Sequence, residues 1–287
     1  MIQIVTDSGC DLWHGDLSPH APLEVLPIRI VPLYVCFGQE DIAETELSPQ
    51  LFWQRIEQGS WPTTASPSPG EFAAAFAAVV EAGHQALCLT TTAAYSSSFA
   101  SAWAAARDFG EQVIVLDSRQ LSRGLGYIAV RAAEAAATGA MLSELIALVN
   151  DLRERMYMVM VVDQVQAVAQ GGRLDRIMPV IARSLQIVSL KPVLTVQDGR
   201  VQLLGVARSF RHGVDRIVAE LTALAPWEGL TVMHTRRPAV ATALTNRLCA
   251  RGHFDPGQRW LAEIGPALAT HVGPGAVGAG ILMSSRG

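Results

Sequence analysis

Residues 86–118 read ALCLTTTAAYSSSFASAWAAARDFGEQVIVLDS, and this stretch decides the fold class. Its two short apolar runs, Ala86–Leu89 and Val113–Leu116, predict two buried strands. Between them, Ser98–Asp108 is typical of a helix, which Gly110 ends. A strand, a helix and a second strand at this spacing indicate parallel strands joined by a crossover helix.

The same alternation continues on both sides of this stretch. The further strands that we expect are Met1–Thr6 and Ile28–Phe37, and prolines at 27 and 32 favour a sheet edge for the second. The further helices that we expect are Ser48–Gln58, Glu71–Ala82, Gly126–Ala137 and Met141–Arg153. Residues 1–160 are therefore predicted to form a three-layer α/β domain, with helices on both faces of a parallel sheet.

The second half of the chain has a different pattern. Two apolar runs, Lys191–Val196 and Val201–Val206, flank Asp198-Gly199, which is a strong hairpin signal. The other expected elements are strands at Met156–Val162 and Leu230–His234, helices at Gln164–Gln170, Leu174–Ile187, Arg211–Ala225 and Ala239–Ala250, and a glycine-rich turn at 271–278 that leads into an apolar strand. Residues 161–287 are predicted to form a smaller α+β domain.

Composition excludes several classes of protein. The chain has 287 residues, which favours two domains, and its net charge of −4 provides no basic surface for nucleic acid. No run of 18 apolar residues occurs, so no transmembrane segment is expected, and the start of the chain lacks the charged region of a signal peptide. Four widely spaced cysteines predict buried free thiols in a reducing cytoplasm; they are Cys10, Cys36, Cys88 and Cys249.

Two loops rich in hydroxyl groups precede predicted helices. The first is Thr63–Glu71, which two prolines stiffen and in which Ser68 and Glu71 have the spacing of a capping box. The second is Thr90–Ser98, which follows a strand. Loops at the carboxyl ends of parallel strands meet at one edge of a sheet, so we expect these two to converge and to bind an anion. Taken alone, each loop also fits a simple helix cap.

Several short motifs occur in an order and at spacings that resemble one family. They are Thr6-Asp7-Ser8, Pro62-Thr63-Thr64, Pro67–Phe72, Ser96–Ala102, Asp117-Ser118-Arg119, Gly124-Leu125-Gly126, Gly171-Gly172-Arg173, Lys191-Pro192, Ile264-Gly265-Pro266 and His271–Gly275. Together they resemble the DegV proteins over nearly the whole chain. The resemblance implies a bacterial, cytoplasmic protein of two α/β domains that holds a long-chain fatty acid between them and uses no other cofactor. Some members present this acid to a fatty acid kinase, so a kinase is the implied partner.

The resemblance also implies a role for individual residues. Thr64 and Ser96 match hydroxyl groups that hold the fatty-acid carboxylate, and His271 matches a histidine that reaches it from the second domain. Ala65 and Ser97 stand where the family usually has serine and glycine. At these two positions the backbone N–H groups are expected to serve, because they do not depend on the side chain.

Two arginines complete the implied site. Arg173 is expected near the mouth of the ligand site, where it would meet the kinase, and Arg208 occupies a position that the family usually keeps basic. The fatty-acid tail would supply most of the binding energy. At about 0.8 kcal/mol per buried methylene, a chain of roughly 14 methylenes gives on the order of 11 kcal/mol before entropy losses.

Other functions are open from the residues alone. Ser96 or Ser68 as a nucleophile with His271 as its base would make an acyl hydrolase, although the chain lacks G-x-S-x-G and an obvious acidic partner. A nucleotide-binding domain would need a third glycine after Gly124-Leu125-Gly126. The seven histidines are scattered without H-E-x-x-H, which disfavours a metal site. For Thr6-Asp7-Ser8 a turn is expected rather than contact with lipid.

Overall fold

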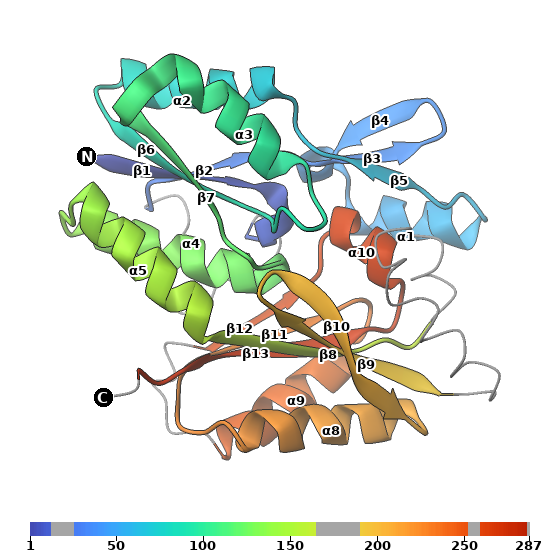
Figure 1. Ribbon diagram of the computed structural model, residues 1–287. Coiled ribbons are helices and arrows are strands. Elements are labelled where there is room, and N and C mark those ends of the chain that lie inside the picture. Colours follow the sequence, from blue (N-terminus) through green and yellow to red (C-terminus); the bar gives the residue numbers. More distant parts are fainter. Residues whose placement is uncertain (13–25, 165–189, 252–258, 286–287) are drawn as a thin grey trace. The chain divides into compact units, whose positions relative to one another are not determined.

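A computed structural model describes residues 1–12, 26–164, 190–251 and 259–285 (Figure 1). Contacts within the chain divide it into two compact units. Of the described residues, the first unit contains 1–12, 26–154 and 265–267. The second unit contains 155–164, 190–251, 259–264 and 268–285. Each unit has its own sheet and its own apolar core.

The first unit is built on a four-stranded parallel sheet. Its strand order is β2-β1-β6-β7, and every neighbouring pair runs parallel. The strands are β1 (Ile2–Asp7), β2 (Ile28–Val31), β6 (Gln85–Thr90) and β7 (Val113–Asp117). This confirms the parallel sheet predicted from the alternation of strands and helices, and it places β2 at an edge, as the flanking prolines indicated.

Helices cover both faces of this sheet and give three layers (Figure 1). Two helices pack side by side on one face and a third packs on the other, followed in the chain by a fourth. In chain order they are α2 (Pro69–Glu81), α3 (Ser98–Ala106), α4 (Ser122–Ala137) and α5 (Leu142–Arg155). Neighbouring residues Ile4 and Val5 on β1 point to opposite faces, and both are fully buried. Such burial is typical of a parallel sheet covered on two sides.

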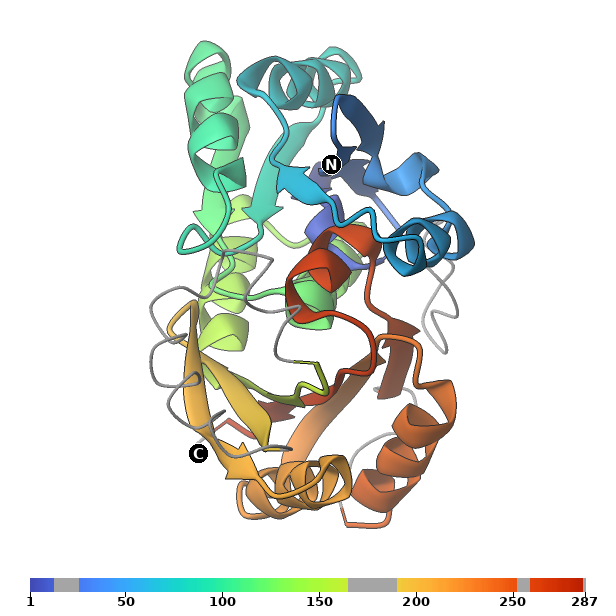
Figure 2. The ribbon, with the colours of Figure 1, turned by 90° about the vertical axis from the view of Figure 1, so that its right-hand side faces the viewer.

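A second, smaller sheet of the first unit was not predicted. It is antiparallel, with the order β4-β3-β5, and lies next to helix α1 (Figure 2). Its elements are β3 (Tyr34–Phe37), β4 (Glu40–Ala43) and β5 (Thr63–Ala65), and α1 spans Pro49–Glu57. The run 28–37 was expected as one strand but contributes to both sheets. Pro32 separates the two parts, because a proline has no N–H to donate to a ladder.

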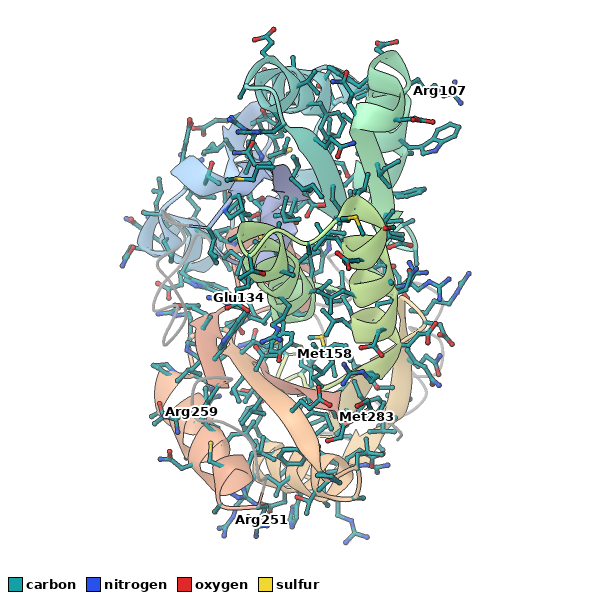
Figure 3. All side chains as sticks on the ribbon, turned by 90° about the vertical axis from the view of Figure 1, so that its left-hand side faces the viewer. Arg107, Glu134, Met158, Arg251, Arg259 and Met283 are labelled. Carbon is teal, nitrogen blue, oxygen red and sulfur yellow. The ribbon has the colours of Figure 1, made fainter. Side chains whose placement is uncertain are left out.

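The second unit has a mixed sheet of six strands, in the order β10-β9-β8-β13-β11-β12. The strands are β8 (Met156–Val161), β9 (Lys191–Gln197), β10 (Arg200–Ala207), β11 (Trp227–His234), β12 (Arg259–Glu263) and β13 (Val277–Met283). Figure 3 labels Met158 on β8 and Met283 on β13, which are neighbouring strands. Helices α8 (Phe210–Thr222) and α9 (Pro238–Cys249) lie along one face. The hairpin at Asp198-Gly199 is confirmed, and so is the α+β class.

Other sequence expectations differ from the structure. The domain boundary near residue 160 stays a prediction; the main segment of the second compact unit begins at Arg155, next to β8. The turn expected from His271 begins with the last residues of a helix, α10 (Pro266–Val272). All four cysteines are free, but burial was wrongly predicted for Cys36 and Cys249, which are only half-buried.

Some expectations fall outside the described residues. They are the helices predicted at 164–170 and 174–187 and the Gly171-Gly172-Arg173 motif. No helix in the described part of the chain combines the length and hydropathy needed to cross a lipid bilayer.

Candidate ligand site

The first hydroxyl-rich loop begins as a strand and ends as a capped helix. β5 pairs with β3, with Thr64 opposite Val35. At the start of α2, the Glu71 backbone N–H donates to the Ser68 hydroxyl at 3.3 Å, and the Ser68 N–H donates to the Glu71 carboxylate at 2.8 Å. This confirms the predicted capping box. The Glu71 carboxylate therefore already supplies a negative charge at the start of α2.

The electrostatics of Glu71 fit this role. The Tyr34 hydroxyl donates to its carboxylate, and Ser68 donates to the other oxygen. Partial burial raises the pKa of Glu71, but the hydrogen bonds from Tyr34 and Ser68 outweigh burial and hold the pKa below its usual value. Glu71 therefore stays ionised and ties the small sheet to the start of α2.

The second hydroxyl-rich loop leaves the carboxyl end of β6. Thr91 and Thr92 are buried, and the Ser96 backbone N–H donates to the Thr92 carbonyl at 3.1 Å. Ser97 follows with φ −80°, an ordinary value, so a serine in place of the usual family glycine causes no backbone strain. Helix α3 then begins at Ser98.

The two loops meet, as predicted, through a residue that sequence analysis did not select. The Ser66 hydroxyl lies 3.1 Å from the Ser96 hydroxyl and accepts a 3.1 Å hydrogen bond from the Ser97 backbone N–H. The Ser96 hydroxyl lies 2.9 Å from that of Ser98 and accepts from the Ser98 N–H at 3.2 Å. Three side-chain hydroxyls and two backbone N–H groups thus converge at the edge of the parallel sheet. The sequence feature that could have identified Ser66 is its position in a loop rich in hydroxyl groups.

The predicted residues of the first unit lie around this cluster. Ser96 is half-buried and Ser97 is exposed. Thr64 is half-buried on β5 and Ala65 is exposed, two and one residues before Ser66. The structure therefore brings the two predicted loops together, with Ser66 as the contact between them.

Of the remaining predicted residues, His271 and Arg208 belong to the second unit. His271 is half-buried near the end of α10. Thr235 holds the turn that follows it, because its hydroxyl donates to the Gly273 carbonyl at 2.7 Å and accepts from the Ala276 N–H at 2.9 Å. Arg208 is exposed between β10 and α8, and Arg173 lies outside the described residues.

Three buried carboxyl groups, those of Asp7, Asp11 and Glu44, also lie in the first unit, and the sequence indicated no role for them beyond a turn at Asp7. Asp7 caps a short 3-10 helix by accepting from the Gly9 N–H at 3.1 Å, and this confirms the predicted turn. Its carboxyl also accepts from the Thr91 N–H at 2.8 Å and the Thr91 hydroxyl at 2.6 Å. Burial raises the pKa of Asp7, of Asp11 to about 6, and of Glu44 to well above its usual range.

Two of these acids hold a distant part of the chain. The Gly265 N–H donates to Asp11 at 3.0 Å, and the Ala267 N–H donates to Glu44 at 2.7 Å. These contacts explain why residues 265–267 belong to the first unit although the chain on both sides belongs to the second. Nothing in the sequence around Asp11 or Glu44 indicated contacts over this separation. In the described residues, no group of three histidine, cysteine or acidic side chains is placed to hold a metal ion.

A family model described as "Uncharacterised protein, DegV family" matches residues 1–284. The chain belongs to the DegV family. The DegV domain-containing protein SCO2569 of Streptomyces coelicolor is 30% identical over 99% of both chains. Among solved structures, "Fatty Acid Binding of a DegV family Protein from Thermus thermophilus" is similar with a TM-score of 0.86 and 28% identity over 99% of both chains.

A further solved structure shares the fold at lower identity. The Streptococcus pneumoniae Fatty Acid Kinase (Fak) B3 protein, loaded with linoleic acid, matches with a TM-score of 0.83 at 18% identity over 99% of both chains. The two structures cover 99% of this chain and confirm the fold class. The family model and the Streptomyces coelicolor relative confirm the resemblance given by the motifs.

Proposed function

We propose that this DegV protein binds a long-chain fatty acid, and that the acid is a carried ligand rather than a substrate of the protein. The observation that carries the proposal is the convergence of Ser66, Ser96 and the Ser97 N–H at the carboxyl edge of the parallel sheet. Support also comes from the Thermus thermophilus relative, whose structure is described as fatty-acid-binding. The fatty acid is the only bound small molecule in this proposal, which includes no cofactor.

In this proposal the first unit binds the carboxylate. Hydroxyls of Thr64 and Ser96 donate to its oxygens, and the Ala65 N–H is a further donor. Ser97 contributes through its N–H, which donates to the Ser66 hydroxyl beside Ser96. A carboxylate removed from water costs several kcal/mol unless it is hydrogen-bonded, and each charge-assisted bond returns roughly 1.5–3 kcal/mol. His271 is proposed as an additional donor.

The proposal also includes a partner protein, a fatty acid kinase that receives the bound fatty acid. Arg173 is proposed to meet a fatty acid kinase because it belongs to the Gly171-Gly172-Arg173 motif, and Arg208 because the family usually keeps this position basic. A cytoplasmic location is proposed from the free cysteines and the family. The Streptococcus pneumoniae protein supports the shared fold only, because its identity to this chain is low.

A serine hydrolase is the alternative function, and the contacts of both candidate nucleophiles disfavour it. In the described residues, the Ser96 hydroxyl contacts the Ser66 and Ser98 hydroxyls, and the Ser68 hydroxyl contacts Glu71. The Ser68 hydroxyl is therefore already engaged in a helix cap, and the Ser96 hydroxyl in the cluster with Ser66 and Ser98. Turnover of a long-chain acyl ester by the purified protein would favour the hydrolase.

The head-group assignment can be tested by removing single hydroxyls. Ser96→Ala and Thr64→Val should each weaken oleate binding by about 10- to 100-fold, because a hydrogen bond to a charged group contributes roughly 1.5–3 kcal/mol. Oleyl alcohol has no charge to lose, so its affinity should change far less. Ser101→Ala, on the same helix as Ser98, is the matched control.

Calorimetry or competition with a fluorescent lipid measures these affinities, and His271→Ala belongs in the same series. Native mass spectrometry of protein expressed in bacteria should show a co-purified long-chain fatty acid. If the parent protein neither carries nor takes up such an acid, the proposed function is wrong. If Ser96→Ala and Thr64→Val bind oleate as tightly as the parent, the function stands but the head group lies elsewhere.

A further inference from the structure

A buried threonine of the second unit holds the turn that follows helix α10. Thr235 comes directly after β11 and is fully buried. Its hydroxyl donates to the Gly273 carbonyl at 2.7 Å and accepts from the Ala276 N–H at 2.9 Å. Its backbone N–H donates to the Ala276 carbonyl at 2.9 Å, and its carbonyl accepts from the Gly275 N–H at 3.0 Å. This one residue therefore makes four hydrogen bonds to the turn at 273–276.

The two hydrogen bonds of the hydroxyl cannot be made by an apolar side chain of the same shape. Gly273 and Ala276 are both buried, and a buried backbone N–H or carbonyl group needs a hydrogen-bond partner. Valine in place of Thr235 would leave the Gly273 carbonyl without the hydroxyl proton and the Ala276 N–H without the hydroxyl oxygen. The shape of the turn therefore depends on the hydroxyl group of Thr235.

The same turn also packs against an ion-paired carboxylate. Gly275 has φ +88°, and a Cβ added to it would lie 2.9 Å from a carboxylate oxygen of Asp163. Asp163 pairs with Lys191 at 2.7 Å and with Arg237 at 2.6 Å. Because two cations hold this carboxylate, it cannot easily move to make room for a displaced turn. The position of the turn is therefore closely defined.

The turn in its place fixes the end of α10, where His271 lies. The Gly273 N–H donates to the Ala269 carbonyl at 2.8 Å and closes the last turn of the helix, and its φ of +71° is typical of the residue that ends a helix. His271 lies between Ala269 and Gly273, inside this closed turn. Since α10 has only seven residues, it is too short to keep its shape without contacts to the rest of the protein.

We propose that Thr235 is a positioning residue for His271, because by holding Gly273 it keeps the end of α10 where the imidazole can donate to the fatty-acid carboxylate. This inference rests on the proposed function, in which His271 is one of the donors. Thr235 touches no ligand in this scheme. A hydrogen bond weakens steeply with distance and angle, so a small displacement of the helix end would remove much of the contribution of His271.

A double-mutant cycle tests whether Thr235 acts through His271, with oleate affinity measured by calorimetry. His271→Ala removes the donor and should weaken binding by about tenfold or more. Thr235→Val should weaken binding by about tenfold in the parent protein. In the His271→Ala protein it should have almost no further effect, because the donor that it displaces is already absent. Thr235→Ser keeps the hydroxyl and should bind oleate like the parent.

Two controls separate this effect from a general loss of packing. Thr231 lies on β11 and is buried, and its hydroxyl has no hydrogen-bond partner within the described part of the chain. Thr231→Val therefore removes a buried threonine hydroxyl close to Thr235 without touching the turn, and it should bind oleate like the parent. Oleyl alcohol carries no charge, so Thr235→Val should change its affinity far less than that of oleate.

A spectroscopic measurement follows the imidazole itself. The histidine side-chain NMR signal that is missing from His271→Ala belongs to His271. Addition of oleate should shift this signal in the parent and in Thr235→Ser, and much less in Thr235→Val. If Thr235→Val fails to fold, Gly275→Ala decides, because its Cβ would meet Asp163 and displace the same turn. It should weaken oleate binding in the parent but not in the His271→Ala protein.

The results distinguish this inference from the proposed function. An equal loss of oleate affinity by Thr235→Val with and without His271 would show a purely structural role and overturn the inference. An unchanged affinity of Thr235→Val, or of His271→Ala, would also overturn it. In each of these cases the parent still binds oleate and the function stands. Absence of oleate binding by the parent overturns the function, and the inference with it.

Discussion

Replacing Asp11 by asparagine should change how the stability of the protein depends on pH. Asp11 is fully buried, and burial raises its pKa from 3.8 to about 6, although Ser122, the charge of Arg123 and the Gly265 N–H oppose this. The shift of about two pKa units corresponds to roughly 3 kcal/mol. The pKa is higher in the folded than in the unfolded state, so the stabilisation is complete below about pH 4. It is lost as pH rises through about 6.

The parent protein should therefore lose stability relative to Asp11→Asn between pH 4 and pH 7, by roughly 3 kcal/mol. Asparagine keeps an oxygen for the Gly265 N–H, and Ser122 can accept from its amide. The variant removes a counter-charge from the buried Arg123, so its absolute stability is also expected to fall. For that reason the informative measurement is how the difference in unfolding free energy between the two proteins changes with pH. The value of this difference at a single pH is not informative.

Urea unfolding of both proteins, followed by tryptophan fluorescence at intervals from pH 4 to pH 8, measures this difference. Asp108→Asn removes an exposed carboxyl of the same unit and is the matched control, with an offset that should stay nearly constant. Parallel stability curves for the parent and Asp11→Asn across this range would refute the reasoning. They would mean that ionising Asp11 costs no more free energy in the folded protein than in the unfolded chain.

Two further substitutions test local packing in the first unit, each by thermal unfolding. Gly126→Ala should destabilise the protein by about 1–3 kcal/mol, because the added Cβ would lie 2.5 Å from the backbone oxygen of Cys10. Gly70→Ala is the control and should have little effect, because the nearest atom to its added Cβ is 3.8 Å away. Ser68→Ala removes half of the capping box with Glu71 and should cost about 1 kcal/mol, and an unchanged melting temperature would show that this cap is dispensable.

The sequence alone predicted the elements whose signals are local. Strand β6, helix α3 and strand β7 follow from short-range periodicity and a stop at glycine, and their parallel arrangement follows from the length of the connection. The capping box at α2 and the hairpin at Asp198-Gly199 were also predictable, because turn and cap chemistry depend on a few neighbouring residues. The DegV motifs added the candidate ligand-binding residues.

The small antiparallel sheet could not be predicted in the same way. β3, β4 and β5 have three or four residues each, which is too short for a reliable alternation pattern. β5 pairs with β3 across some thirty residues, and so it was interpreted as part of a loop. Its formation depends on partner strands that local sequence does not specify.

What the sequence by itself determined is the order of strands and helices, the parallel sheet, and the position of two hydroxyl-rich loops at one edge of it. Only the tertiary structure decided that Ser66 joins these loops and that Thr91 binds the buried carboxyl of Asp7. The reason is that periodicity and caps depend on neighbours a few residues away. A hydrogen bond such as that between Thr91 and Asp7 joins residues 84 positions apart, and only the folded chain determines that they meet.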